Sequence, residues 1–186
     1  MSLTFDPIKF EVAHNALNEA TEEMSAALRH SAYSTNNKTR NDFSSVFFDA
    51  KLRTVAQAFN QPVHLGSTSF SVPRIIEKYG MERFSPRDAI LCNDPYPGSV
   101  HLTDIFLVTP VFFQEGLIGY VVNLAHHVDV GGGSAASIGA FREQYQEGFI
   151  SPQVRLVKSG RLVEDVFNLV LSQIRSKREN AGDFRA

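Results

Sequence analysis

The sequence predicts an α+β protein in which mixed or antiparallel β-hairpins form a sheet packed against a long N-terminal helix and a C-terminal helix. Three observations support this fold class. Apolar residues recur at every fourth position over residues 8–28, two long runs rich in Val, Ile and Phe lie between residues 102 and 125, and residues 162–180 are amphipathic. We expect one domain, because 43% of the 186 residues are hydrophobic, which is enough for a core.

The N-terminal helix is expected to begin at Asp6-Pro7, with the aspartate as N-cap and the proline at the first helical position. Six apolar residues spaced by four then share one face of the helix: Ile8, Val12, Ala16, Ala20, Met24 and Leu28. We expect this face to be buried in the core. His14 and His30 lie off this face and are expected at the surface.

Shorter segments follow. A polar loop is expected over residues 31–42, and a hairpin is expected from strands at 43–48 and 52–58. Residues 61–67 are predicted to form a loop that carries His64, followed by a short helix at 70–79 that ends at Gly80. A turn at 85–88 precedes a buried strand at 89–92. That strand ends at Cys92, which has no obvious His-Asp support and is not expected to be a nucleophile.

The rest of the chain is organised around residues 93–134. Leu102–Phe113 and Leu117–Ala125 are typical β-strands, and Gln114-Glu115-Gly116 between them favours a tight hairpin turn. Because a hairpin brings the start of one strand beside the end of the other, residues about 25 positions apart become neighbours at its open end. His101 and Asp104 lie where the first strand begins, and His126, His127 and Asp129 lie where the second ends.

Two imidazoles and a carboxylate at a sheet edge are suitable ligands for a divalent metal. A hydrogen-bonded polar network is the alternative interpretation of the same residues. Since side chains alternate along a strand, His126 and His127 are expected to point to opposite faces, so only one of them can join His101. The spacing alone does not choose between them.

Gly131-Gly132-Gly133 follows this hairpin and permits positive φ angles. No Lys-Ser/Thr pair follows it and no G-x-G-x-x-G enters a helix, so it does not match a phosphate-binding loop. A lid, an anion-binding turn and a plain connecting loop remain as interpretations. We expect a mobile loop over residues 135–148, a strand at 154–157, and a helix from Leu162 to about Asn180 with one apolar face: Val166, Leu169, Val170 and Ile174.

Composition bounds the partners and the compartment. The net charge of −2 and the pI near 6.3 give no reason to expect binding to nucleic acid or to an anionic membrane. The chain has no apolar run of about 18 residues and no signal-peptide pattern at its N-terminus. A single cysteine excludes an internal disulfide and is typical of the reducing cytoplasm, where we expect the protein.

Several segments together resemble one family. These are FDPIKFEVAHNALNEATEEMSAALRHSAYS, RNDFSSVFFDA, QPVHLGS, NDPYPGSVHLTDIFLVTPVF and LAHHVDVGGG. They are similar to the hydantoinase B family, which includes the B subunits of N-methylhydantoinase and caprolactamase, the C-terminal half of 5-oxoprolinase, and large subunits of acetone and acetophenone carboxylases. The resemblance covers nearly the whole chain and corresponds to about the first third of family members. Residues 1–186 are therefore expected to be the N-terminal metal-binding part of a hydantoinase B-like domain, continued by further chain or subunits.

The resemblance also implies a reaction. A hydantoinase A-like ATPase subunit phosphorylates the oxygen of a lactam, imide or ketone, and the B-type protein, which binds a divalent metal, completes the reaction. We expect zinc or manganese as the metal, ATP to be used by the partner, and a small cyclic amide or ketone as substrate. Hydrolysis of a cyclic amide or imide is the preferred expectation. A subunit of a ketone carboxylase, or a non-catalytic assembly subunit, is the alternative.

The family's functional residues map onto this sequence through its motifs. The resemblance implies metal ligation by four residues: Asp42, His101, Asp104 and His126. Three others are then candidates for catalytic roles beside the metal or facing the substrate: His127, Asp129 and His64. Four more are expected to bind substrate: Asn93, Asp94, Gly131 and Gly132.

Overall fold

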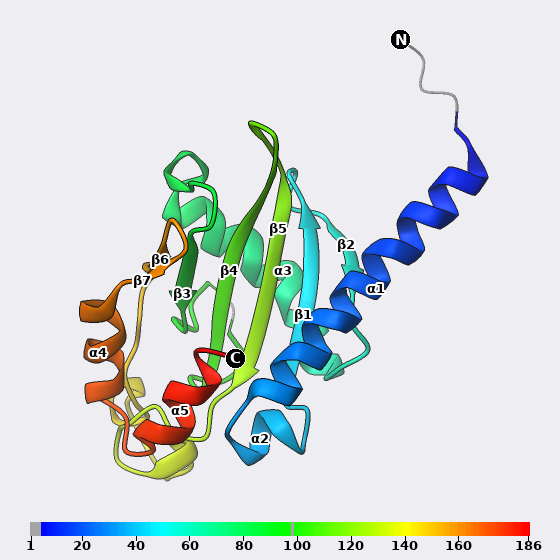
Figure 1. The fold of residues 1–186 in the computed structure, drawn as a ribbon. Coiled ribbons are helices and arrows are strands. Elements are labelled where there is room, and N and C mark those ends of the chain that lie inside the picture. The colour runs from blue at the N-terminus through cyan, green and yellow to red at the C-terminus, as the bar shows by residue number, and fades with distance from the viewer. Residues whose placement is uncertain (1–4, 98) are drawn as a thin grey trace.

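The structure is a computed structural model that describes residues 5–97 and 99–186. One antiparallel sheet of seven strands forms its centre, in the order β2-β1-β5-β4-β3-β6-β7, and helices cover both faces (Figure 1). The expected α+β fold class is confirmed. The helices are α1 (Pro7–Ser31), α2 (Thr35–Lys38), α3 (Pro62–Tyr79), α4 (Glu164–Ser172) and α5 (Lys177–Asp183), and the strands are β1 (Phe43–Asp49), β2 (Thr54–Gln57), β3 (Ala89–Cys92), β4 (Asp104–Phe113), β5 (Gly116–His126), β6 (Val154–Lys158) and β7 (Arg161–Leu162).

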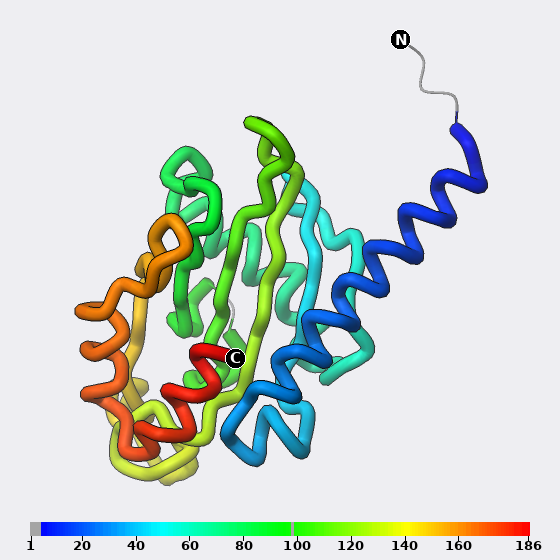
Figure 2. The backbone as a smooth tube through the Cα atoms, viewed as in Figure 1, coloured from blue at the N-terminus to red at the C-terminus, as the bar shows by residue number. Residues whose placement is uncertain are grey.

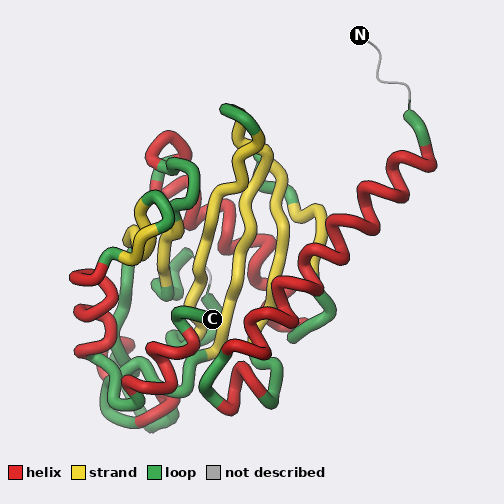
Figure 3. Tube along the Cα trace, in the orientation of Figure 1, coloured by secondary structure: helices red, strands yellow, loops and turns green. Residues whose placement is uncertain are grey.

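The two faces of the sheet have separate cores because side chains alternate along each strand. Helix α3 lies behind the sheet in Figure 1, and its Val72, Ile75 and Ile76 pack against even-numbered residues of the central strands. On the other face, α4 and α5 cover β3, β4 and β6, and α1 crosses β1 and β2 (Figure 3). The even-numbered residues in this first core are Val46, Phe48, Phe106, Val108, Tyr120, Val122 and Leu124.

The central hairpin is confirmed with small changes in its bounds. Asp104 pairs with His126 at the open end and Phe113 pairs with Gly116 at the turn, so only Gln114 and Glu115 connect the strands. The expected hairpin of β1 and β2 and the strand β3 are also present. β1 lies beside β5 rather than at a sheet edge, with Phe43 opposite Ala125. Asp42 therefore arrives next to His126.

Helix α1 begins as predicted, since the Asp6 side chain accepts hydrogen bonds from the backbone of Ile8 and Lys9. The prediction that its whole apolar face is buried is wrong. Leu28 is buried, but Ile8 and Val12 are 75% and 65% exposed. A helix of this length spans about 37 Å, and Figure 2 shows its N-terminal half running diagonally past β2, beyond the sheet that covers its C-terminal half.

Two further expectations are wrong in their bounds. Residues 61–67 are not a loop but the first turns of α3, with Pro62 at the first helical position. The predicted helix over 162–180 is divided into α4 and α5. Its break is held by tertiary hydrogen bonds: Asp129 accepts from the backbone and guanidinium of Arg175, at 2.6 and 2.8 Å.

Two loops contain short helices. α2 lies within the polar segment expected over residues 31–42. The segment expected as a loop over 135–148 contains two 3₁₀ helices, Ala135–Ser137 and Gln144–Gln146, at the open end of the central hairpin. Within the part of the chain that the structure describes, no helix has both the length and the apolar character that crossing a membrane requires.

Candidate metal centre

Three strand ends place acidic and imidazole side chains in one row. Asp42 immediately precedes β1, Asp104 begins β4 and His126 ends β5. Because side chains alternate along a strand, these even-numbered residues lie on the face of the sheet that α3 covers. They follow directly on the buried apolar residues of that face, such as Phe106 and Leu124. The backbone fixes the row, since Asp104 pairs with His126 and the His126 amide donates to the Asp42 carbonyl at 2.9 Å. His126 Nδ1 lies 2.7 Å from Asp104 Oδ1.

Helix α3 adds a fourth side chain from below the sheet. His64 is buried in its first turn, with Nε2 at 3.7 Å from Asp104 Oδ1 and 3.9 Å from Asp42 Oδ1. Both separations exceed hydrogen-bond length. Among the described residues its other nitrogen, Nδ1, also lacks a hydrogen-bond partner. A buried imidazole that faces two carboxylates at this distance leaves room for a shared cation.

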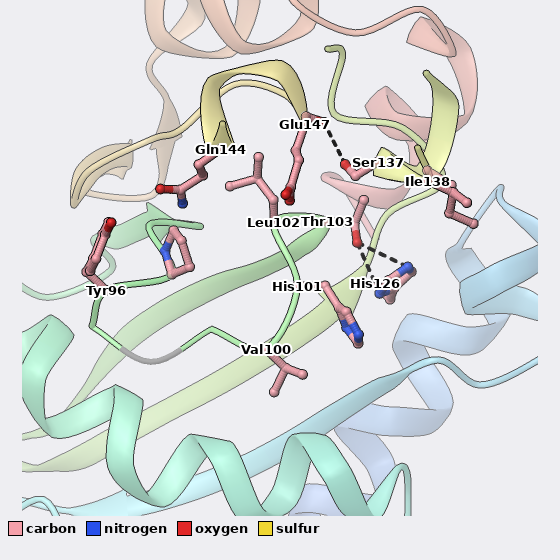
Figure 4. A pocket seen from close by; sticks show the side chains of 12 residues that line it. Tyr96, Val100, His101, Leu102, Thr103, His126, Ser137, Ile138, Gln144 and Glu147 are labelled. Atoms are coloured by element: carbon pink, nitrogen blue, oxygen red, sulfur yellow. Dashed lines mark hydrogen bonds between the residues drawn. The ribbon is translucent and has the colours of Figure 1, made fainter. Parts of the chain in front are cut away.

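His101 lies at the rim of this cluster, beside a cavity of about 580 Å³. Its Nδ1 is 3.1 Å from Asp104 Oδ2, its side chain is 55% exposed, and its ring meets that of His126 edge to face. In Figure 4, His101 and His126 point into the same space below Thr103, whose hydroxyl contacts the His126 ring. The cavity is large enough for a small molecule. Its lining is Pro95, Tyr96, Val100, His101, Leu102, Thr103, His126, Ala136, Ser137, Ile138, Gln144 and Glu147.

The electrostatics of the cluster suit a cation. Burial on its own raises the pKa of Asp104, but the hydrogen bond from His126 and the nearby imidazoles outweigh it, so this pKa lies below its ordinary value. Burial lowers the pKa of His126, yet the Asp104 and Asp42 carboxylates reverse the effect and raise it. For His64 burial prevails, and its pKa is lowered. The aspartate is therefore charged, and His64 favours the neutral form in which imidazole binds metals.

The residues present fit a divalent metal. Donor atoms that share one cation at about 2.1 Å stand about 3.4 to 4.2 Å apart. The distances from His64 to the two carboxylates lie in this range, whereas His126 Nδ1 and Asp104 Oδ1, at 2.7 Å, are at hydrogen-bond distance and would have to separate to share the cation. The ligand atoms of His64, Asp104 and His126 all lie within 4.8 Å of one another. Mixed imidazole and carboxylate donors accept zinc, manganese or iron. Of the four predicted ligands, Asp104 and His126 lie in this compact group together with His64, Asp42 approaches it through His64 at 3.9 Å, and His101 stands at the rim.

His127 and Asp129 lie away from the cavity. The His127 side chain is buried on the opposite face, where Nδ1 lies 2.8 Å from Asn180 Oδ1 and the ring stacks on Phe184. Both carboxylate oxygens of Asp129 are occupied by Arg175, and one also accepts from the Gly131 amide. These contacts hold the end of β5.

The four residues expected to bind substrate do not appear among those that line the cavity. Asn93 is fully buried and bonds the backbone of Leu102, Phe149 and Ser151, so it ties the start of the site to the segment that precedes β6. Asp94 pairs with Lys78. Gly131 and Gly132 have φ angles of 83° and 75°, and a Cβ at either would overlap neighbouring backbone. The glycines allow a close crossing of chains, which favours the connecting-loop interpretation.

Cys92 ends β3 with no exposed surface, and burial raises the pKa of its thiol to about 11. We therefore expect the folded protein to resist iodoacetamide at pH 8. At that pH only about one thiol in a thousand would be ionised, against roughly a quarter for an ordinary cysteine. Mass spectrometry of the native and the urea-unfolded protein tests this. Equal labelling rates in both states would contradict the assigned burial.

Sequence reasoning missed part of the site. The cavity wall formed by Ser137, Ile138, Gln144 and Glu147 lies on a loop whose polar composition resembles that of any surface segment. The contact of His64 with the carboxylates depends on α3 beginning at Pro62. Proline after a polar residue was the local signal for that start.

Comparison with known proteins places this geometry in a family. A match to hydantoinase B/oxoprolinase covers residues 6–186. The chain belongs to this family. It is 40% identical over 184 residues to an uncharacterised protein of Methanocaldococcus jannaschii, covering 97% of this chain and 33% of that protein. It is 34% identical over 185 residues to the caprolactamase subunit beta of Pseudomonas jessenii, covering 98% of this chain and 32% of the relative.

Two solved structures share the fold. The ATP-dependent caprolactamase of Pseudomonas jessenii matches with a TM-score of 0.82 and 27% identity, over 98% of this chain and 31% of that one. Acetone carboxylase, in its nucleotide-free structure, matches with a TM-score of 0.90 and 19% identity, over 97% of this chain and 24% of that one. The second likeness concerns the fold alone. The chain spans about a third of the length of the two relatives named above, and 13% of the 5-oxoprolinase of Saccharomyces cerevisiae, with which it shares 37% identity.

Proposed function

We propose that this chain carries the divalent metal site of an ATP-dependent amidohydrolase, which opens a cyclic amide or imide after an ATPase partner has phosphorylated it. The observation that carries this proposal is the convergence of Asp104, His64 and His126 from three separate elements beside a cavity, with the Asp42 carboxylate 3.9 Å from His64. Side chains of this kind, brought together from distant parts of the sequence, are a metal-ligand set. A structural subunit without a metal has no physical need for them.

In this proposal Asp42, Asp104 and His126 hold the metal, zinc or manganese, and His64 closes the set from α3. A divalent cation lowers the pKa of water and polarises a bound oxygen, so that water attacks an activated amide carbon at neutral pH. His101 lies between the ligands and the cavity. With Nδ1 held by Asp104, it leaves Nε2 to exchange a proton with a molecule in the cavity.

Hydrolysis is preferred over carboxylation because of the relatives. The caprolactamase subunit shares 34% identity with this chain, whereas the likeness to acetone carboxylase, at 19%, is one of fold. The need for an ATPase partner is inferred from the hydantoinase B family and from the ATP dependence in the name of the caprolactamase. Further segments of a hydantoinase B-like protein are proposed to complete the cavity, since the relatives are about three times as long.

The test is an assay of the purified native assembly with uncharged lactams and hydantoins. We expect ATP-dependent release of the ring-opened amino acid, loss of this activity after treatment with a chelator, and recovery with zinc or manganese. The assay is repeated with small ketones in place of the lactams, with and without bicarbonate. Bicarbonate-dependent formation of a carboxylated ketone would instead establish the carboxylase alternative. Full activity in assemblies that lack metal would contradict the proposed metal site and favour the alternative that this chain is a non-catalytic assembly subunit.

A further inference from the structure

Asp183, the last residue of α5, is a buried carboxylate that lies outside the metal cluster. It is 6% exposed, and its Oδ1 accepts from the backbone amides of Tyr33 and Ser34 at 2.8 and 3.0 Å. Its Oδ2 accepts from the Asn37 side chain at 2.9 Å. Among the described residues no lysine or arginine forms an ion pair with it. Its hydrogen bonds all come from neutral groups. Burying a carboxyl group is costly, and here these three hydrogen bonds offset that cost.

The donors that bond Asp183 belong to residues 33–42, here called the α2 segment, which contains α2 and ends at Asp42. Ser34 caps α2, and the carbonyl of Asn36 in that helix accepts from the Asp42 amide at 3.0 Å. The Asn36 side chain also donates to the His126 carbonyl at 3.4 Å. The α2 segment thus holds the backbones of two of the proposed metal ligands, and Asp183 holds the α2 segment.

Asn41 and Gly182 suit the path of the α2 segment and the docking of α5 on it. Asn41 directly precedes Asp42 and has a φ angle of 54°, in the left-handed region that non-glycine residues seldom adopt. Asparagine adopts this region more readily than other non-glycine residues, so the residue type at position 41 suits the turn that leads to Asp42. The docking of α5 is also close, because a Cβ at Gly182 would overlap the Tyr33 ring.

The same helix holds the other side of the site. Asn180, one turn before Asp183, bonds His127, and Phe184 stacks on the His127 ring at 4.5 Å. His127 follows His126 directly in the chain. Helix α5 therefore contacts the α2 segment and the end of β5 at once, the two places from which Asp42 and His126 reach the metal.

We propose that Asp183 is a positioning residue for the metal centre: it fixes the α2 segment so that Asp42 and His126 face one cation. This inference rests on the proposed function, since it assumes a metal held by those two residues. Residues that orient metal ligands from outside typically change metal affinity by 10- to 100-fold when they are replaced. Asp183 acts through backbone and side-chain donors rather than by touching the metal or a substrate.

The experiment measures zinc affinity in the full chain, purified in its native assembly, by competition with a chromophoric chelator. For Asp183→Asn we expect affinity to fall about 10- to 100-fold. In this variant the carboxylate acceptor is lost and the new amide group faces the Asn37 amide donor against donor; only a turn of Asn37, whose Oδ1 has no partner among the described residues, would place an acceptor there. The matched control is Asp88→Asn. Asp88 is another buried carboxylate, which accepts from the amides of Ser85 and Ser159 and pairs with Arg155, at the far end of β3.

Thermal unfolding of both variants separates positioning from general loss of structure. We expect similar decreases in Tm but a loss of zinc affinity only in Asp183→Asn. A second variant, Asn37→Asp with Asp183→Asn, exchanges the two side chains and again places a donor opposite an acceptor. We expect its zinc affinity to lie within about threefold of that of the unmodified protein, which is less than the effect of losing a typical neutral hydrogen bond. Unchanged affinity in the single variant, or equal losses in Asp88→Asn, would overturn the inference. If the unmodified protein binds neither zinc nor manganese, it is the proposed function that fails.

Discussion

Replacing Asp104 by asparagine is expected to abolish ATP-dependent hydrolysis by the native assembly. Asp104 is fully buried and contacts His64, His101 and His126, so it is the carboxylate that all three imidazoles share. Asparagine keeps the shape but removes the charge that holds a cation. Because residues that only orient ligands change metal affinity up to about 100-fold, we expect a larger decrease for a ligand itself.

Turnover and zinc affinity measured on the same preparations test this prediction. The Asp88→Asn variant, altered at the other end of the sheet, serves as the control for the loss of a buried carboxylate and should keep both properties. An Asp104→Asn protein that retained metal and turnover would show that the cluster is a polar network and not a metal centre.

Replacing Phe106 by alanine is expected to lower the free energy of unfolding by about 3 to 5 kcal/mol. Phe106 is fully buried near the start of β4, opposite Leu124, in the core between the sheet and α3. Since small domains have a total stability of about 5 to 15 kcal/mol, this one change would remove a large share of it.

Urea unfolding of the purified assembly checks the value, with Phe113→Ala as the matched control. Phe113 ends the same strand but is 66% exposed, so its replacement should change the free energy of unfolding by less than about 0.5 kcal/mol. Comparable losses in both variants would contradict the assignment of even-numbered β4 residues to the α3 face.

Local patterns were enough to predict the centre of the fold. The alternation and the turn residues of 102–126 depend only on neighbouring residues, so both strands and the meeting of Asp104 with His126 could be predicted from the sequence. The apolar face of α1 showed a different limit. Amphipathicity marks a surface suited to burial, but it does not show whether another element lies over it, and nothing in the described structure covers Ile8 or Val12.

The remainder of the site depends on contacts between distant elements. The break between α4 and α5 follows from the bonds of Arg175 to Asp129, which no helical pattern in residues 162–180 could indicate. Asp42 came from the family resemblance alone, because its approach to His126 requires β1 to pair with β5. The bonds of Asp183 to residues 33–37 span about 150 positions and leave no local signature.

The most direct test of the account is elemental analysis of the native assembly, purified without chelators. The proposed centre of Asp42, His64, Asp104 and His126 predicts about one zinc or manganese per chain, as in other sites with these ligands. Absence of a stoichiometric metal from an assembly that hydrolyses its substrate would contradict the metal centre and leave the convergent side chains as a hydrogen-bonded network.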